Sequence, residues 1–422
     1  MSLRTLAATC GTVLLAQFAV SPAALAASAP GHWVTAWATA LQPIPQQPNL
    51  PPLYRAPNVA GRTVRQIVYP TLSGSAVRLH VSNEYGDAPL VIQELRIARS
   101  TGGAAVQGNG GARATFDGNA SVIVPPGGAL DSDPVAIDVV AGAPYAISSY
   151  MGAEQRLVAW HRVSNQVNYV SLPGNHASDA LSGTFGQRFT QFAWVTGLAV
   201  DVPSAATVAA IGDSITDGMR SSLNENRRWP DAFSRRLVRA GDGSTAVVNL
   251  GISGNRLLND SPCYGDALAK RFGRDVLEHP GVKTAILLIG INDINFSSTP
   301  ARAGLDCDLP HTSVTAADLV AGYERVIADA HRHGVRVFGA TLTPAALPPQ
   351  RESIRLAVNQ WVRTSKALDG VADFDAALRD PAQPDHLRCT YDSGDHIHPS
   401  DAGYAAMADA IPLEAVVNST RK

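Results

Sequence analysis

The sequence of 422 residues predicts two successive folds: a β-sandwich or jelly-roll-like domain over residues 27–203, and a three-layer, doubly wound parallel α/β domain over residues 204–422. In the first part, short runs of alternating apolar residues are divided by Gly/Pro turns at intervals of about ten residues, a pattern typical of β-sandwiches. In the second part, apolar runs alternate with helical patterns, which favours a parallel sheet covered by helices.

The strands of the first part are expected around residues 63–69, 77–81, 95–97, 122–124, 135–137 and 145–147. Its role has two interpretations. A carbohydrate-binding module would use exposed tryptophan rings as stacking faces, and a packing domain would bury them. We favour packing for the four candidates Trp33, Trp37, Trp160 and Trp194.

In the second part, five strands are expected at residues 206–211, 246–250, 284–289, 335–343 and 371–374. The third strand is apolar nearly throughout, as a central parallel strand should be. Helices are expected from Trp229 to Val238, around Leu268, after a capping-box-like start at Thr315, and around Val358. The last helix is expected to begin near Ser400.

The first 26 residues have the pattern of a secretory signal peptide: Arg4, an apolar run over residues 6–20, and the small residues Ala24 and Ala26 around a cleavage site near Ala26. We therefore expect a secreted or periplasmic protein. An N-terminal membrane anchor is the alternative, but the run is short and interrupted by polar residues, so no stable membrane insertion is expected. A net charge of −2 argues against a nucleic-acid partner. Oligomeric state stays open.

Polar residues follow four of the expected strands, at Ser214, at residues 251–255, at residues 290–293 and at residues 395–399. The carboxyl ends of parallel strands meet at one edge of a sheet, where open α/β folds place their sites. A serine hydroxyl is a poor nucleophile and needs an adjacent base, which His398 can supply. Asp395 can accept the other imidazole N–H and hold the ring in place.

In order and spacing, the blocks Gly212-Asp213-Ser214, Gly254, Asn292 in Gly-Ile-Asn-Asp, and His398 before Pro399 resemble the four blocks of the SGNH/GDSL hydrolase family. The resemblance covers about residues 204–413 and implies that family's flavodoxin-like sheet. Residues 81–86 resemble, less specifically, the β-rich N-terminal region of some exported bacterial members. The family pattern implies Ser214 as nucleophile, His398 as base, and an oxyanion hole formed by the Ser214 N–H, the Gly254 N–H and the Asn292 side chain.

Several neighbouring residues compete for these roles. His396 is the rival base, and Gly251 is the rival backbone donor. Asp213 and Asp293 are expected to be structural. A metal site formed by His396 and His398 lacks a third ligand at a suggestive spacing, and no Cys-x-x-Cys occurs, so we expect neither metal nor organic cofactor. The absence of Gly-x-Ser-x-Gly argues against an α/β-hydrolase nucleophile elbow.

Cys10 would leave with the signal peptide, so Cys263, Cys307 and Cys389 remain. One disulfide is plausible in an exported protein. Our hypothesis pairs Cys263 with Cys307, which would tie together the two loops that carry oxyanion donors. Cys389 is the rival partner for either.

These patterns predict an exported serine esterase that acts on short acyl esters, with acetyl groups on a polysaccharide as one candidate substrate. A lipase or lysophospholipase acting on longer chains is the alternative within the enzyme class. A carbohydrate-binding protein with a vestigial hydrolase domain is the alternative outside it. Loops at residues 220–228 and 295–310 would shape the acyl pocket.

Overall fold

The computed structural model describes residues 31–153, 155–297 and 299–420. The predicted signal peptide and Cys10 lie outside the described residues. From His32 onward, the described residues form one compact unit. None of the described helices combines the length and the apolar character needed to cross a membrane.

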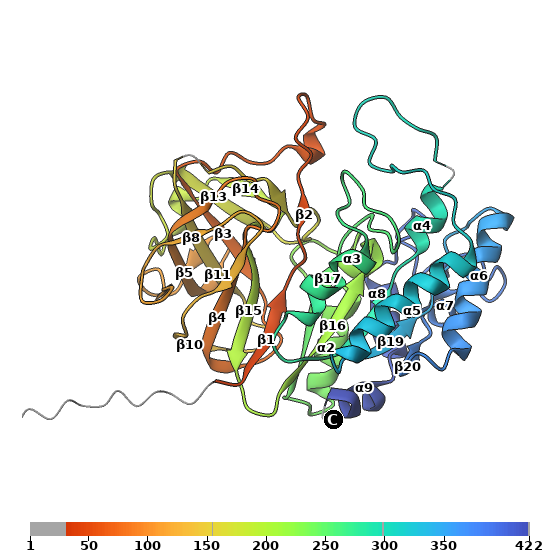
Figure 1. Ribbon diagram of the computed structural model, residues 1–422. Coiled ribbons are helices and arrows are strands. Elements are labelled where there is room, and N and C mark those ends of the chain that lie inside the picture. Colours follow the sequence, from red (N-terminus) through yellow and green to blue (C-terminus); the bar gives the residue numbers. More distant parts are fainter. Residues whose placement is uncertain (1–30, 154, 298, 421–422) are drawn as a thin grey trace, which may run out of the picture. The chain divides into compact units, whose positions relative to one another are not determined.

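Residues 32–201, called here the β region, form two antiparallel sheets (Figure 1). The strands of the first sheet, in spatial order, are β1 (Trp33–Ala38), β15 (Val195–Asp201), β4 (Gly74–Ser82) and β10 (Val135–Val139), with β9 (Ala129–Asp131) beside β4. Those of the second are β14 (Gln187–Phe189), β13 (Asn168–Pro173), β3 (Arg62–Val68), β11 (Tyr145–Met151), β5 (Leu90–Gly102) and β6 (Ala105–Val106), with β7 (Ala112–Ala114) and β8 (Val122–Val124) beside β5. A two-stranded ribbon joins β2 (Gln42–Pro43) to β12 (Ala159–Trp160), and the region has two 3-10 turns, η1 (Pro52–Tyr54) and η2 (Ser182–Thr184).

The inward residues of both sheets share one apolar core, because alternate side chains of each strand point to the same face. Trp37, Trp160 and Trp194 are buried in that core. Trp33 is half-buried, and the Arg78 guanidinium lies over its ring at 4.8 Å from the ring centre. The tryptophans therefore pack the β region, and the stacking interpretation loses three of its four candidates.

Residues 206–420, called here the α/β region, contain a five-stranded parallel sheet. Its strands, in spatial order, are β17 (Thr245–Gly251), β16 (Ala206–Gly212), β18 (Val282–Leu288), β19 (Arg336–Ala340) and β20 (Gly370–Ala372). All seven residues of β16 are buried, because the strand is paired on both edges and covered on both faces. The five strands lie where the sequence predicts them, and their ends differ from the expected ones by at most three residues.

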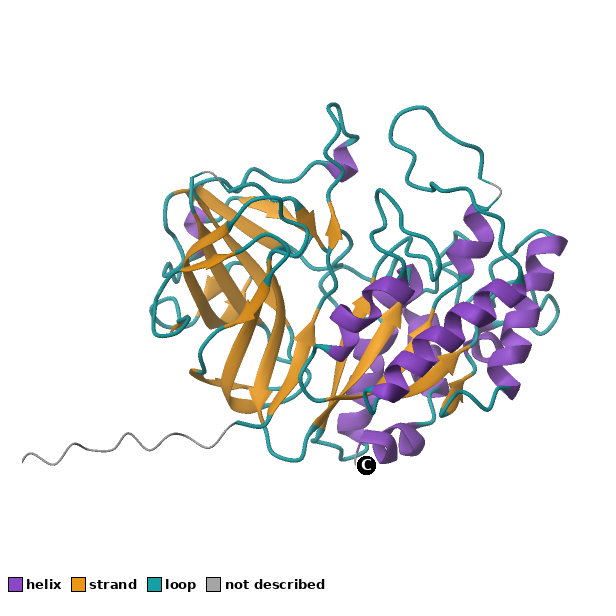
Figure 2. Cartoon of the chain, in the orientation of Figure 1, coloured by secondary structure: helices purple, strands orange, loops and turns teal. Residues whose placement is uncertain are grey.

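The helices of the α/β region are α1 (Ser214–Asp217), α2 (Trp229–Arg239), α3 (Leu268–Phe272) with the π-helical turn η3 (Gly273–Leu277), α4 (Ile291–Phe296), α5 (Ala316–Arg332), α6 (Pro349–Thr364), α7 (Phe374–Leu378), α8 (Asp401–Ala410) and α9 (Leu413–Thr420). Figure 2 shows them around the sheet; α5 contacts α3 and α6, and α2 contacts α8. Thr315 and Asp318 form the capping box expected at the start of α5.

One helix assignment from the sequence is wrong. The helix that begins after Ser400 is not the last, because it ends at Ala410 and α9 follows. With eight residues, α9 is too short to show a clear helical period. It is held by tertiary contacts: Val416 and Val417 are buried, and Ser419 Oγ lies 2.6 Å from Thr284 Oγ on β18.

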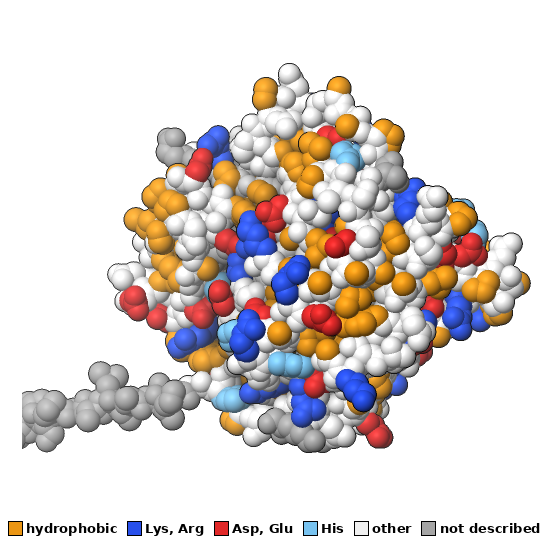
Figure 3. Space-filling view, turned by 45° about the vertical axis from the view of Figure 1, so that its right-hand side comes forward, with side chains coloured by type: hydrophobic (Ala, Val, Ile, Leu, Met, Phe, Trp, Pro, Cys, Tyr) orange, Lys and Arg blue, Asp and Glu red, His pale blue; other side chains and the backbone are white. Residues whose placement is uncertain are grey.

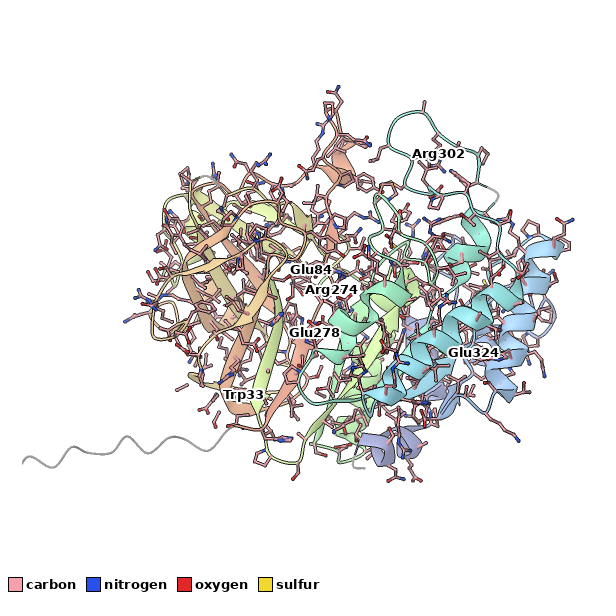
Figure 4. The ribbon with its side chains drawn as sticks, viewed as in Figure 1. Trp33, Glu84, Arg274, Glu278, Arg302 and Glu324 are labelled. Atoms are coloured by element: carbon pink, nitrogen blue, oxygen red, sulfur yellow. A yellow bond between two sulfur atoms is a disulfide. The ribbon has the colours of Figure 1, made fainter. Side chains whose placement is uncertain are left out.

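The strand pattern changes between Asp201 and Ala206, but the packing continues across this point. Strand β1 contacts β17 and β16, and its last residue, Ala38, lies in the apolar core of the parallel sheet. Glu84 forms an ion pair with Arg274, and Figure 4 shows the two side chains at this junction. The β region and the α/β region therefore share a packed, charged interface.

Charged side chains of both signs are interspersed on the face shown in Figure 3, in agreement with the net charge of −2. The mixture of signs on this face gives no strong field of a single sign there.

The cysteines are arranged as the pairing hypothesis expects. Cys263 and Cys307 form a disulfide, with their Cα atoms 4.9 Å apart, and Cys389 is an exposed free thiol. The bond joins the segment after β17 to the segment after α4.

We expect peptide mapping without reductant to recover the Cys263 and Cys307 peptides joined. Replacing both by Ala should lower the free energy of unfolding by about 4 kcal/mol, because the bond closes a long loop in the unfolded chain. Cys389→Ala is the matched control and should change stability little. A Cys263 peptide recovered as a free thiol would contradict the pairing.

Candidate active site

Ser214 is the first residue of α1, directly after strand β16. The turn between them requires glycine at position 212, since a Cβ there would lie 2.1 Å from the Leu288 carbonyl oxygen. The Asp213 side chain caps α1 by accepting the Ile215 N–H at 3.0 Å. The fold thus presents the Ser214 hydroxyl at the carboxyl edge of the sheet.

His398 and Asp395 meet Ser214 in a chain of hydrogen bonds. His398 Nε2 lies 2.8 Å from Ser214 Oγ, and His398 Nδ1 lies 2.9 Å from Asp395 Oδ2. Asp395 Oδ1 also accepts the backbone N–H groups of Ile397 and His398 at 3.1 and 2.8 Å. Partial burial opposes ionisation of Asp395, but these hydrogen bonds outweigh it and hold its pKa well below the usual range.

The rival base, His396, lies away from the serine. Its Nδ1 is 2.6 Å from Asp392 Oδ2, and 67% of its side chain is exposed. Its backbone has φ of 65°, and its ring pairs with Asp392, whereas the ring of His398 pairs with Asp395 and Ser214. His398 is therefore the histidine that the structure brings to Ser214.

Two of the three proposed oxyanion donors, at Ser214 and Gly254, lie in loops that start side by side, because the parallel register pairs Gly212 with Gly251. Gly254 has φ of 85°, and a Cβ there would lie 2.4 Å from the Tyr264 ring. Its rival Gly251 already donates its N–H to Asn249 Oδ1 at 3.0 Å. The geometry favours Gly254 as the free backbone donor.

Asn292 lies in the first turn of α4 and is 8% exposed. Its side-chain amide donates to the Asn255 carbonyl at 2.9 Å. This bond ties the side chain of Asn292 to the residue that follows Gly254. The segment that carries Gly254 and the segment that carries Asn292 are therefore joined by this bond and by the disulfide.

Two buried carboxyl groups lie beneath these loops and have raised pKa values. Burial raises the pKa of Asp213 to about 7, with the carboxyl groups of Asp293 and Asp217 adding to the effect. Burial also raises the pKa of Asp293 to about 6, although its oxygens accept the N–H groups of Leu257 and Leu258 at 2.8 and 3.0 Å. Asp213 and Asp293 thus bond loop backbone, as the sequence predicts.

A buried guanidinium, which the sequence analysis did not identify, joins the same loops. Arg271 donates to the carbonyls of Gly212 and Leu250 at 2.9 and 3.0 Å and to Asn255 Oδ1 at 3.0 Å. Asp275 balances its charge at 2.8 Å. No motif marks Arg271, because a helical arginine is usually a surface residue.

Two further polar contacts at the site were also missed. Arg220 Nε lies 3.1 Å from Asp395 Oδ2, within a loop that the sequence analysis assigned only to pocket shape. His161 of the β region lies 3.0 Å from Asp217, the last residue of α1. Within the described residues, no group of three His, Cys, Asp or Glu side chains is arranged to hold a metal ion.

The family model of GDSL-like lipases and acylhydrolases matches residues 210–406. Comparison with curated proteins gives no match. Among solved structures, the chain is similar to a carbohydrate acetylesterase from Sinorhizobium meliloti, with 16% identity, TM-score 0.39, and coverage of 50% of this chain and 99% of that chain. It is also similar to the native aryl esterase of M. smegmatis, with 16% identity, TM-score 0.39, and coverage of 51% and 99%.

A lipase/acylhydrolase from Enterococcus faecalis gives a comparable match, with 19% identity, TM-score 0.37, and coverage of 51% of this chain and 96% of that chain. The matched segment includes Ser214, Gly254, Asn292 and His398. Residues 210–406 of this chain belong to the GDSL-like lipase/acylhydrolase family.

Proposed function

We propose that this protein is an exported serine esterase that hydrolyses carboxylic esters through an acyl-enzyme. The observation that carries the proposal is the continuous hydrogen-bonded chain from Ser214 Oγ through His398 to Asp395, at 2.8 and 2.9 Å. This arrangement supplies a nucleophile, a base within reach of its proton, and an acid that orients the base.

In the proposed reaction, Ser214 Oγ attacks the ester carbonyl carbon while His398 Nε2 takes the hydroxyl proton. The tetrahedral intermediate collapses, the C–O bond to the alcohol breaks, and His398 returns the proton to the leaving alkoxide. Water then attacks the acyl-serine with His398 again as base, which releases the acid and restores Ser214. Asp395 stays ionised throughout and stabilises the imidazolium.

Negative charge develops on the carbonyl oxygen in both tetrahedral intermediates. We assign the Ser214 N–H, the Gly254 N–H and the Asn292 amide to this oxygen. Donors fixed before the reaction stabilise the charge without reorganisation, and this is usually a large share of catalysis. The disulfide, the Asn292–Asn255 bond and buried Arg271 support such rigidity.

The proposed substrates are short acyl esters, including acetyl groups on polysaccharides. The support is a wall of aromatic side chains beside the oxyanion loops: Tyr264 packs against Gly254, and Phe296 stacks on Tyr264 with ring centres 5.7 Å apart. Cys263 anchors this wall through the disulfide. We place a short acyl group against this wall, and a lipase or lysophospholipase acting on longer chains is the second candidate.

Export is also a proposal. It is supported by the signal-peptide pattern of residues 1–26 and by a disulfide, a bond that persists in oxidising compartments. A carbohydrate-binding protein with a vestigial hydrolase domain is disfavoured, because the bonds from Ser214 to His398 and from His398 to Asp395 are intact.

The first test compares acetyl and octanoyl nitrophenyl esters, with the Ser214→Ala protein as blank. We expect turnover by the natural protein, a preference for acetyl, and no turnover by a normally folded Ser214→Ala variant. Equal or faster octanoyl hydrolysis would favour the lipase alternative. Absence of hydrolysis of every ester by pure protein would instead revive the vestigial-domain alternative.

Asn292→Ala should lower kcat by about 100- to 1000-fold, because it removes one donor to the developing oxyanion. KM should change little, since the neutral ester carbonyl needs that donor less. Asn295→Ala, three residues further along α4, is a control. Steady-state kinetics on the acetyl ester decides the matter, and a near-natural kcat for Asn292→Ala would remove it from this role.

Asp213 provides a contrast with the proposed triad acid. Asp395→Asn should abolish most turnover, whereas Asp213→Asn should retain it, because the amide oxygen can still cap α1.

The raised pKa of Asp213 means that the folded protein holds a proton which the unfolded chain releases near pH 4. Its contribution to stability is present below that pH and is lost as pH rises through about 7.

The Asn side chain of the Asp213→Asn variant does not ionise, so the variant does not lose this stability. Between pH 5 and pH 8, the difference in free energy of unfolding between the variant and the natural protein should therefore change in favour of the variant by on the order of 2 kcal/mol. Urea unfolding at the two pH values measures the difference. A difference independent of pH would show that Asp213 is ionised in the folded protein throughout this range.

A further inference from the structure

The β region reaches the proposed catalytic machinery through the segment His161–Val167, which follows strand β12. His161 is 3% exposed, and its ring stacks on Phe192 of the β region with ring centres 6.1 Å apart. The ring therefore has a fixed position. Its polar atoms point to three oxygen atoms rather than to solvent.

Those oxygens all act as acceptors. His161 Nδ1 lies 3.0 Å from the Ala40 carbonyl, and Nε2 lies 3.0 Å from Asp217 Oδ1 and 3.1 Å from the Val163 carbonyl. Two of these partners are backbone carbonyls and the third is the Asp217 side chain, so fixed groups hold both ring nitrogens. His161 and Asp217 form a buried pair, with side chains 4% and 2% exposed.

The other oxygen of Asp217 bonds the loop that carries Gly254. Asp217 Oδ2 accepts the Ser253 backbone N–H at 2.9 Å and the Ser253 hydroxyl at 2.5 Å. Asp217 itself is the last residue of α1, the short helix that begins with Ser214. One buried carboxylate thus connects His161, the nucleophile helix and the residue next to the proposed oxyanion donor.

The same segment makes further bonds to the chain that leaves α1. Asn165 Nδ2 donates to the Gly218 carbonyl at 2.6 Å, and the Asn165 carbonyl accepts the Asn224 N–H at 2.9 Å. In return, Asn224 Oδ1 accepts the N–H of Val167 at 2.7 Å. These bonds hold the loop of residues 218–224. Arg220 of the same loop donates a hydrogen bond to Asp395.

We propose that His161 is a positioning residue for ester hydrolysis, and that the β region thereby completes the active site in place of serving as a detachable module. His161 fixes Asp217, and Asp217 sets the spacing between the Ser214 hydroxyl and the Gly254 N–H. The inference rests on the proposed serine-esterase function and on Gly254 as an oxyanion donor.

The expected consequence appears in kcat more than in KM. A Gly254 N–H displaced by a fraction of an ångström still permits the neutral ester to bind, but it stabilises the oxyanion poorly. Misplacement of about 1 Å far from the reacting atoms can cost about 100-fold in rate. A purely structural histidine would lower the amount of folded protein without altering kcat per folded active site.

The experiment compares His161→Leu with His161→Gln in the full chain. Leu fills similar space but cannot donate to Asp217, whereas the Gln amide can reach the position of Nε2. We expect His161→Leu to lower kcat by about 10- to 100-fold, with KM within about twofold, and His161→Gln to recover a clear part of the loss. Active sites are counted by covalent titration with an organophosphonate, so that unfolded protein is excluded from kcat.

His176→Leu is the matched control in the same region. His176 also pairs with an aspartate, Asp179, at 2.9 Å, and its contacts lie within the β region. This variant should keep the natural kcat. If His161→Leu folds poorly, Ser253→Ala offers a milder test, because it removes only the hydroxyl bond to Asp217.

The two positions do not bond each other and act through Asp217, so their effects on kcat should be non-additive. We expect the double variant His161→Gln/Ser253→Ala to lose less than the product of the single losses. Two outcomes would overturn the positioning role: a kcat of His161→Leu equal to that of the natural protein, or equal losses of kcat in the Leu and Gln variants. Either outcome leaves the serine-esterase proposal standing as long as Ser214→Ala is inactive. Full activity in Ser214→Ala would overturn the serine-esterase proposal, and the role of His161 with it.

Discussion

The alignment of three parallel strand ends is the constraint on which the candidate site depends. Strand β16 is paired on both sides, so that Gly212 lies level with Gly251 on β17 and Leu288 on β18. Three loops therefore leave the sheet at one edge, and they carry Ser214, Gly254 and Asn292. The close approach of Gly212 to the Leu288 carbonyl leaves no room for a side chain at this point.

The loops are held by buried charges as well as by apolar packing. Arg271 binds the carbonyl groups at the ends of β16 and β17, while Asp217 and Asp293 bind the N–H groups of the loop after β17. Burial of such groups is costly unless they are paired, so each must meet its partner in one geometry. This requirement favours a single loop arrangement, which an oxyanion hole needs.

The β region extends this network beyond the matched family segment. Three of its tryptophans lie in its own apolar core. Its polar contacts to the α/β region include those of the segment that begins at His161, which bonds Asp217. The interface also includes the Glu84–Arg274 ion pair and the contact of β1 with the parallel sheet. The β region is therefore continuous with the structure that positions Ser214, which explains why the break in strand pattern near residue 203 is not a break in packing.

The sequence by itself determined the strands and most helices of the α/β region, since apolar runs and helical periods are local properties of the chain. It also identified Ser214, Gly254, Asn292 and His398 as candidates, because each lies in a short, recognisable block. Tertiary structure alone decided that His398 and not His396 meets the serine, that Cys263 pairs with Cys307, and that α9 is a helix. It alone brought Arg271 and His161 to the site, because a bond between residues 56 positions apart depends on how the sheets pack and leaves no local pattern in the chain.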